Sequence, residues 1–215
     1  MHASAGQART MSDSRVQQEW DERYSGAEQL FSGRPNTVLV AEVSGLTPGR
    51  ALDVGCGEGA DAVWLATMGW TVTGLDVSQV ALDRAASRAK NAGVEVNWLR
   101  ADLVEASLPV GGFDLVSAQY PALRSSENRD AERALVTAVA PGGVLLVVHH
   151  AGFDGEAAKA RGFDPADYVF PPDVLSLLGS DWDVHFEERR PRETPLGDDE
   201  HRHTHDAVLL ARRRP

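Results

Sequence analysis

A glycine-rich segment near residue 50 combines the residue types that small-ligand sites use. It reads DVGCGEG over residues 53–59 and lies between a predicted strand at 51–54 and a predicted helix at 60–68. Glycines let the backbone turn tightly and approach a ligand, and free N–H groups at a helix start favour negative charge. The spacing G-x-G-x-G differs from the G-x-G-x-x-G of dinucleotide folds, and Asp53 precedes it. A carboxylate there disfavours a pyrophosphate and suits a ligand with an ammonium group.

Two further acids follow the next predicted strands. Asp76 comes after the strand at 71–75, and Asp102 comes after the strand at 94–99. In doubly wound sheets, an acid at the first of these places accepts hydrogen bonds from ribose hydroxyls. At the second, Asp102 could meet the amino group of an adenine, with Leu103 against the ring. The alternative for each acid is an ordinary surface position at a strand end.

Alternating strands and helices must position these residues. Ser14 to Tyr24 and Val38 to Val43 are predicted helices, and Ser78 is a predicted N-cap. Strand–helix alternation with apolar strands predicts an α/β fold, a doubly wound, mostly parallel sheet with helices on both faces. Two consecutive strands near the end predict a terminal antiparallel hairpin and a seven-stranded sheet. Beyond those given above, the expected strands are 113–118, 144–148, 182–188 and 204–211, and the expected helices are 80–91, 126–140 and 171–178, with a turn at 141–143.

Composition limits the classes of protein that fit. The 215 residues are 42% hydrophobic and 25% charged, as in globular chains. A net charge of −11 argues against nucleic-acid and membrane partners, and a single cysteine excludes an internal disulfide. We expect residues 1–13 to be a disordered tail and 14–215 a single domain. The start of the chain lacks a signal-peptide core, so the expected location is cytoplasmic.

Five motifs in succession resemble those of class I S-adenosylmethionine-dependent methyltransferases, which have a Rossmann-like fold. They are DVGCGEG, GLDVS at 74–78, ADL at 101–103, FDLV at 113–116 and PGG at 141–143, and they cover roughly residues 36–150. In addition, WDERY at 20–24 with Pro35-Asn36 resembles the small bacterial tellurite-resistance and thiopurine methyltransferase group. The resemblance implies a helical lid over 14–48, a cofactor-binding core over 49–150, and acceptor-side helices with the hairpin over 151–215.

The resemblance also implies roles for single residues. Asp53 would lie near the cofactor's ammonium group, and Asp76 would hold the ribose. Cys56, within the loop, is interpreted as small and packed and not as a nucleophile. The other implied cofactor contacts are Gly55 and Gly57 with the methionine part, Val77, Asp102 and Leu103 with the adenine, Ala118 and Gln119 near the methyl group, and Trp20 and Tyr24 in the lid.

Acceptor-side candidates are less defined. The sequence places His149 and His150 at the end of the fifth strand, and His201, His203 and His205 at the start of the last. In this sheet those two ends lie close together, so His150 with His203 or His205 is a candidate base, polar anchor or metal ligand; solvated histidines are the alternative. Tyr120 is a third candidate. The arginines Arg189, Arg190, Arg192 and 212–214 are interpreted as a solvated edge, with steering of an anionic substrate as the alternative.

The implied activity is methyl transfer by in-line displacement from S-adenosylmethionine to an unidentified small molecule, which leaves S-adenosylhomocysteine. Residues 118–121 read AQYP where amino-methylating relatives carry an Asn/Asp-Pro-Pro-aromatic motif, and this disfavours a DNA acceptor. The expected assembly is a monomer or homodimer, with no structural metal. The alternatives are a non-catalytic S-adenosylmethionine-binding protein and an NAD-dependent Rossmann oxidoreductase.

Overall fold

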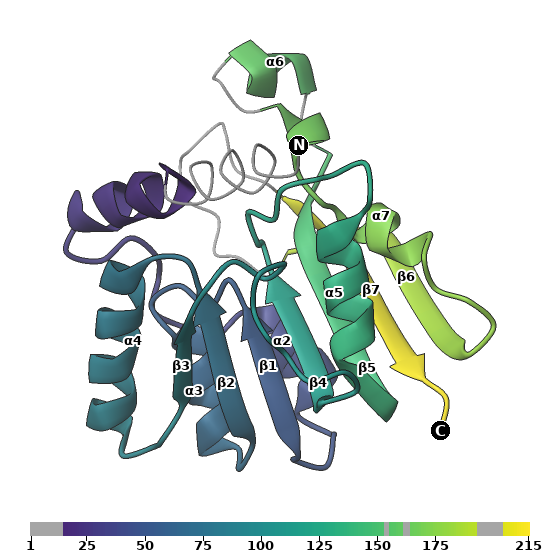
Figure 1. Cartoon of the computed structure of the whole chain (residues 1–215), viewed down its shortest axis with the longest axis horizontal. Helices are drawn as coiled ribbons and strands as arrows, with labels where there is room; N and C mark the ends of the chain where they lie inside the picture. Colours follow the sequence, from purple (N-terminus) through teal and green to yellow (C-terminus); the bar gives the residue numbers. More distant parts are fainter. Residues whose placement is uncertain (1–14, 153–154, 161–163, 193–203) are drawn as a thin grey trace, which may run out of the picture.

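The structure of the chain is a computed structural model that describes residues 15–152, 155–160, 164–192 and 204–215 (Figure 1). The predicted tail at 1–13 and the candidates His201 and His203 lie outside these residues. A helix over residues 15–25 comes first. The elements that follow are α2 (Thr37–Val43), β1 (Arg50–Val54), α3 (Ala60–Thr67), β2 (Thr71–Asp76), α4 (Gln79–Ala92), β3 (Asn97–Arg100), β4 (Phe113–Gln119), α5 (Asp130–Ala138), β5 (Val139–Ala151), α6 (Gly155–Ala160), the 3₁₀ helix η1 (Pro165–Asp167), α7 (Pro171–Leu175), β6 (Trp182–Pro191) and β7 (His205–Arg213).

The seven strands form one sheet in the order β3-β2-β1-β4-β5-β7-β6. Strands β1 to β5 pair in parallel, and β7 runs antiparallel between β5 and β6. The predicted fold class is therefore confirmed, including the terminal hairpin. The chain changes direction across the sheet between β1 and β4, and ligands of open α/β sheets bind at such a switch point, outside the carboxyl ends of the strands.

Helices cover both faces of the sheet, which explains why the central strands are apolar at consecutive positions. Figure 1 shows α5 and α7 in front of the sheet and α2 and α3 behind it. Since neighbouring residues of a strand point to opposite faces, Leu52 packs into the α5–α7 side and Ala51 into the α2–α3 side. Helix α4 packs against α3 and the β3 edge. Its predicted N-cap is confirmed, because Ser78 Oγ accepts the Ala81 N–H at 3.2 Å.

Several predicted boundaries are wrong. Helix α5 is shorter than the predicted 126–140, and the predicted turn at 141–143 lies inside the long strand β5. There Val139 pairs with Phe113 but Val144 pairs with Leu115, so the intervening residues bulge out of the ladder. The turn-forming residues thus make a bulge within one strand. Strand β3 begins at Asn97 and not at 94, and α7 ends at Leu175, with turn-type hydrogen bonds continuing to Leu178.

Within the described part of the chain, no helix has both the length and the apolar character that crossing a bilayer requires.

Candidate cofactor-binding and active site

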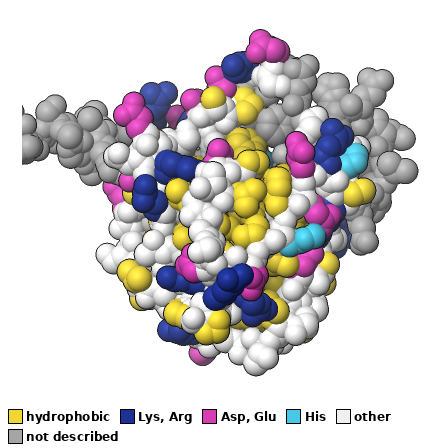
Figure 2. Space-filling model, turned by 90° about the vertical axis from the view of Figure 1, so that its right-hand side faces the viewer, with side chains coloured by type: hydrophobic (Ala, Val, Ile, Leu, Met, Phe, Trp, Pro, Cys, Tyr) yellow, Lys and Arg dark blue, Asp and Glu magenta, His cyan; other side chains and the backbone are white. Residues whose placement is uncertain are grey.

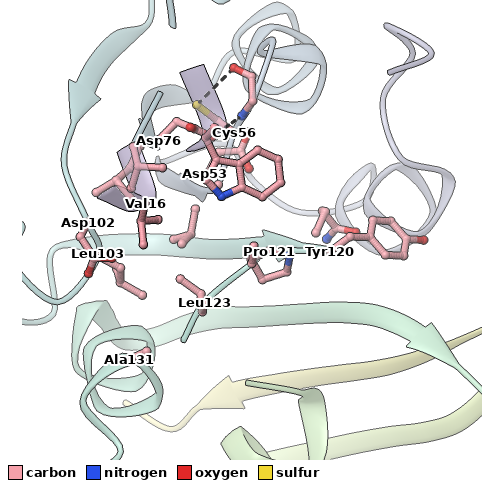
Figure 3. Close-up of a pocket in the computed structure, with 18 of the residues that line it drawn as sticks. Val16, Asp53, Cys56, Asp76, Asp102, Leu103, Tyr120, Pro121, Leu123 and Ala131 are labelled. Carbon is pink, nitrogen blue, oxygen red and sulfur yellow. Dashed lines mark hydrogen bonds between the residues drawn. The ribbon is translucent and has the colours of Figure 1, made fainter. Parts of the chain in front are cut away.

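A cavity of about 990 Å³ opens at the carboxyl ends of the parallel strands (Figure 3). It lies where β1, β2 and β4 end, at the switch point of the sheet. Most of the residues singled out from the sequence lie on its wall, although they come from segments more than 100 residues apart. The wall includes Trp20, Tyr24, Asp53, Gly55, Cys56, Gly57, Asp76, Val77, Asp102, Leu103, Gln119, Tyr120 and His150.

Two candidates lie elsewhere. Ala118 is fully buried in the core on the α5 side of the sheet, and it is not among the described residues that line the cavity. His205 is likewise absent from that wall, and its ring contacts the Thr204 hydroxyl at 2.9 Å. In the part of the chain that the structure describes, no group of three or more His, Cys, Asp or Glu is arranged to hold a metal.

The glycine loop has a backbone that requires its glycines. Gly57 has φ of +51°, a conformation that other residues adopt at a cost, and a Cβ there would lie 2.8 Å from Tyr24 Oη. The Gly57 N–H donates to Asp76 Oδ2 at 2.8 Å, and the Ser78 N–H donates to Asp76 Oδ1 at 2.9 Å. The carboxylate that ends β2 therefore fixes the loop that follows β1.

Asp53 is a buried carboxylate on the cavity wall. Its side chain is 2% exposed, and its Oδ2 atom has no hydrogen-bond partner among the described residues. Burial, together with the nearby carboxylates of Asp61 and Asp76, raises the pKa of Asp53 well above its ordinary value. A cationic ligand at this place would both supply the missing donor and relieve the repulsion between the carboxylates.

Asp61 is a cavity residue that sequence reasoning missed. It follows the glycine loop in α3 and accepts two hydrogen bonds from Asn36, from the backbone N–H and from Nδ2, both at 2.7 Å. Burial raises the pKa of Asp61, and the two bonds from Asn36 lower it in part. Asn36 belongs to the Pro35-Asn36 motif, and that motif was the feature of the sequence from which this contact could have been predicted.

The adenine-side candidates lie together. Asp102 Oδ1 accepts the Val104 N–H at 2.8 Å, and Leu103 is buried beneath it. Figure 3 shows both at one end of the cavity, near Asp76 and Val16, while Tyr120 and Pro121 lie toward the other end. Val16, from the helix over residues 15–25, was not predicted to reach this wall.

The helix over residues 15–25 lies on the cavity wall, and its own Asp21 joins it to the start of α4. Asp21 accepts hydrogen bonds from Ser78 Oγ at 2.6 Å and from the Val80 N–H at 3.2 Å, both at the start of α4. Tyr24 is buried, and its ring lies 5.9 Å from that of Trp20. The placement of Trp20 and Tyr24 on the cavity wall is what a lid requires, although the lid role itself stays a prediction.

Cys56 is packed within the loop. Its side chain is buried, and burial, with Asp53 and Asp76 nearby, raises the pKa of its thiol well above the ordinary value. Nucleophilic cysteines have the opposite property, a lowered pKa. The environment thus fits the interpretation of Cys56 as a small packed residue.

The end of the cavity around Tyr120 contains a polar residue, Asp206, that was not predicted. Asp206 is buried and accepts a hydrogen bond from Tyr120 Oη at 2.8 Å and from Arg192 Nη1 at 3.0 Å. His150 pairs with Asp206 across β5 and β7, whereas His205 pairs with Ala151. Because neighbouring strand residues face opposite sides, Asp206 and not His205 shares a face with His150.

The prediction of a solvated arginine edge is wrong for Arg192, which lines the cavity. Other members of that group are paired with acids, as in Arg190 with Glu42 at 2.6 Å and Arg214 with Asp183 at 2.6 Å. Figure 2 shows basic and acidic side chains interspersed on the β6 side of the molecule, with hydrophobic side chains between them.

Comparison with known proteins agrees with this geometry. Residues 51–143 match the family described as a methyltransferase domain. An uncharacterized methyltransferase of Mycobacterium tuberculosis (strain ATCC 25618 / H37Rv) is 41% identical over 97 residues, which are 45% of this chain and 48% of that protein. The 27-O-demethylrifamycin SV methyltransferase of Amycolatopsis mediterranei (strain S699) is 31% identical over 155 residues, 66% of this chain and 55% of that protein.

The chain spans about half the length of these curated relatives. A solved structure titled "Conversion of a Disulfide Bond into a Thioacetal Group during Echinomycin Biosynthesis" superposes with a TM-score of 0.68 at 25% identity, covering 93% of each chain. The finer resemblance to the tellurite-resistance and thiopurine group stays a prediction. Residues 51–143 are therefore a methyltransferase domain, and the shared fold and the ordered motifs on one cavity are similar to those of S-adenosylmethionine-dependent methyltransferases.

Proposed function

We propose that this protein transfers a methyl group from S-adenosylmethionine to a small-molecule acceptor. The observation that carries the proposal is the buried Oδ2 of Asp53, a residue of the glycine-loop cavity wall; no residue that the structure describes donates to this atom. Leaving a buried acceptor oxygen without a hydrogen bond is costly, so such atoms in native proteins call for an explanation. The ammonium group of the cofactor would supply the missing donor.

A second buried oxygen supports this fit. Gln119, at the end of β4, also lines the cavity, and its Oε1 has no partner among the described residues, while its Nε2 donates to Ser117 Oγ at 3.1 Å. Asp53 lies one residue before the end of β1, and Gln119 ends the adjacent strand β4, so both oxygens would face one cationic group. Asp76 would then hold the ribose, and Val77, Asp102 and Leu103 would contact the adenine.

The role of the chain in the reaction is to bind, orient and exclude water. When bound, the cofactor supplies a methyl group that its sulfonium already activates for displacement. The protein needs to align the acceptor with that methyl group, and such positioning can contribute about 7–11 kcal/mol in favourable cases. Trp20, Tyr24 and the segment around Phe31 would exclude water from the cofactor side, and Tyr120 and His150 would border the acceptor.

Size and charge favour a small-molecule acceptor. Pockets for small molecules are typically about 300–1,000 Å³, and this cavity of about 990 Å³ is large enough for a cofactor together with a second small ligand. The net charge of −11 disfavours a nucleic-acid acceptor. One relative is named for methylating a rifamycin, which is a small molecule. A cytoplasmic location and a monomeric or homodimeric state remain predictions from the sequence.

Isothermal titration calorimetry with S-adenosylmethionine, S-adenosylhomocysteine and NAD tests the cofactor. We expect both sulfur compounds to bind and NAD not to bind; NAD binding without the other two would refute the proposal. Turnover is tested by release of S-adenosylhomocysteine across panels of small hydroxyl, amine, thiol and carboxylate compounds, ribosomal RNA and ribosomal protein. Turnover confined to the macromolecules would overturn the small-molecule part, and binding with no turnover on any panel would favour a non-catalytic binding protein.

A further inference from the structure

Three buried carboxylates meet at the glycine-loop end of the cavity. Asp53 lies near the end of β1, Asp61 in the first turn of α3, and Asp76 at the end of β2. All three line the cavity, with exposed fractions of 2%, 6% and 7%, and Figure 3 shows Asp53 and Asp76 near one another on its wall. Asp53 pairs with Gly74, so Asp53 and Asp76 point to the same face of the sheet, the face that α3 covers.

Every donor that reaches these carboxylates from the described part of the chain is neutral. The backbone N–H and the side-chain amide of Asn36 donate to Asp61, and backbone N–H groups donate to Asp76 and Asp53. No arginine, lysine or histidine among the described residues forms an ion pair with any of the three acids. Buried charges are ordinarily paired with an opposite charge, so this cluster lacks a cation.

The neighbouring charged groups do not supply that cation. Glu58 pairs with Arg84 at 2.8 Å, and Asp21, on the helix over residues 15–25, pairs with Arg100 at 3.4 Å. Arg34 lines the cavity but is exposed, and it forms no ion pair with the three acids among the described contacts. The remaining arginines of the cavity wall pair with acids outside the cluster: Arg15, Arg124 and Arg192.

The acidity of the cluster reflects the missing cation. Burial raises the pKa of each of the three acids, and for Asp53 the other two carboxylates add to the rise. The Tyr24 hydroxyl and the Cys56 thiol beside them stay neutral, because burial raises their pKa values as well. A ligand that brings positive charge would stabilise the ionised carboxylates, and an acid that holds a proton in the free protein would exchange it for that charge.

The two forms of the proposed cofactor differ by one positive charge. Both carry the same ammonium and carboxylate groups, so these groups cancel when the two affinities are compared. In methyl transfer the electron pair of the broken C–S bond stays on sulfur, and the sulfonium becomes a neutral thioether. The sulfur lies on the covalent path between the ammonium group and the ribose, which the proposed function places at Asp53 and Asp76. Carboxylates on both sides of the sulfur would therefore attract the sulfonium and not the thioether.

We propose that Asp53, Asp61 and Asp76 make the site selective for the positively charged form of the cofactor, so that S-adenosylmethionine binds more tightly than S-adenosylhomocysteine. The inference rests on the proposed methyltransferase function. One added unit charge beside these carboxylates should lower the dissociation constant about 10- to 100-fold. Loss of that charge in the reaction would weaken the hold on the product and favour its release.

Isothermal titration calorimetry of the whole protein at pH 8 tests the selectivity. The probes are S-adenosylmethionine, S-adenosylhomocysteine and sinefungin, in which a carbon with a protonated amine replaces the methylated sulfur. We expect sinefungin to bind nearly as tightly as S-adenosylmethionine, and S-adenosylhomocysteine to bind at least tenfold more weakly. Product affinity equal to or higher than that of S-adenosylmethionine would overturn the proposal. Sinefungin binding as weak as that of the product would show that the methyl group and not the charge is recognised, which would also overturn it.

Asp61→Asn tests the origin of the selectivity, because it keeps the size of the side chain and removes one charge. The ratio of the two dissociation constants should fall severalfold, whereas Asp83→Asn, at an exposed carboxylate of α4, should leave it unchanged. A purely structural defect would weaken all three ligands by the same factor, and that result would refute the role of the Asp61 charge. If Asp61→Asn does not fold, Asp53→Asn must lower the ratio instead, and an unchanged ratio there would count against the proposal.

The same titrations separate this inference from the proposed function on which it rests. Binding of none of the three ligands to the native protein would refute the proposed function, and the inference with it. Equal binding of S-adenosylmethionine and S-adenosylhomocysteine would refute the charge selectivity alone.

Discussion

Replacing Asp53 by asparagine should have opposite effects on stability and on cofactor binding. The substitution keeps the shape of the side chain but removes the charge that burial and the carboxylates of Asp61 and Asp76 make unfavourable. In the absence of cofactor, no donor from the described part of the chain reaches Oδ2 to stabilise that charge. The asparagine protein should therefore be more stable than the native protein and bind the cofactor more weakly.

The sign of the stability effect follows from proton linkage. Because burial raises the pKa of Asp53 in the folded state, the folded state holds this proton more tightly than the unfolded state does. The stability that Asp53 contributes in its protonated form is therefore lost as pH rises from about 4, the ordinary aspartate value, through the raised folded pKa. Asparagine does not ionise, so Asp53→Asn should raise the free energy of unfolding at neutral pH and flatten its decline with pH.

The effect on binding has the scale of one hydrogen bond to a charged group. Such a bond contributes roughly 1.5–3 kcal/mol, which corresponds to a dissociation constant raised about 10- to 150-fold. The ammonium group of the cofactor should also lower the pKa of Asp53 on binding, so that the native protein releases protons as the complex forms. The Asp53→Asn protein should release fewer protons on binding.

Calorimetry in two buffers of different ionisation enthalpy measures both affinity and proton release, and urea unfolding of the cofactor-free protein measures stability. Asp83→Asn, at an exposed carboxylate of α4, is the matched control and should change neither. Unchanged affinity in Asp53→Asn would mean that the ammonium group lies elsewhere. A loss of stability would mean that Oδ2 itself has a donor in the cofactor-free protein, which would refute the argument from the unpartnered oxygen.

Other positions give simpler tests. Asp76→Ala should weaken cofactor binding by roughly 1.5–3 kcal/mol in the same titration, and unchanged affinity would place the ribose elsewhere. Gly59→Ala should lower the free energy of unfolding in urea by about 1–3 kcal/mol, because φ is +78° and the new methyl group would lie 2.7 Å from the Ala85 Cβ. The control is Gly45→Ala, whose new methyl group would have nothing within 4 Å and should leave the free energy of unfolding unchanged. Cys56, the only thiol, should react with a disulfide reagent far more slowly in the native protein than in urea; equal rates would contradict its burial.

The cofactor half of the site could be predicted because its information is local. The loop at 53–59 begins in the last residues of β1, Asp76 ends β2, and Asp102 comes two residues after β3, and parallel strands bring their carboxyl ends to one edge of the sheet. Recognising three strands was therefore enough to place three parts of one cavity. Ala118 shows the limit of that reasoning, because a displacement of one residue along β4 separates the buried Ala118 from Gln119 on the cavity wall.

The acceptor half could not be predicted because its information is not local. Arg192 reaches the cavity from beyond the end of β6, and no spacing in the sequence relates it to His150. The choice between His205 and Asp206 depended on the register of β7 against β5, which pairs His150 with Asp206. A shift of one residue reverses which side chain faces the cavity, and neither side chain has the size or apolar character that would fix the register from the sequence.

Glu58 and Asp61, two acids in and just after the glycine loop, link that loop to the N-terminal segment at residues 24–36. Glu58 accepts the N–H groups of Leu30 and Phe31, both at 3.2 Å, and pairs with Arg84, which also donates to the Tyr24 carbonyl. Asp61, three residues later, accepts two hydrogen bonds from Asn36. Gly55 and Gly57 thus line the cavity, while Glu58 and Asp61 hold the segment at residues 30–36. A change that moves the glycine loop should therefore also loosen the segment at residues 30–36, because residues 53–61 position both the cavity wall and that segment.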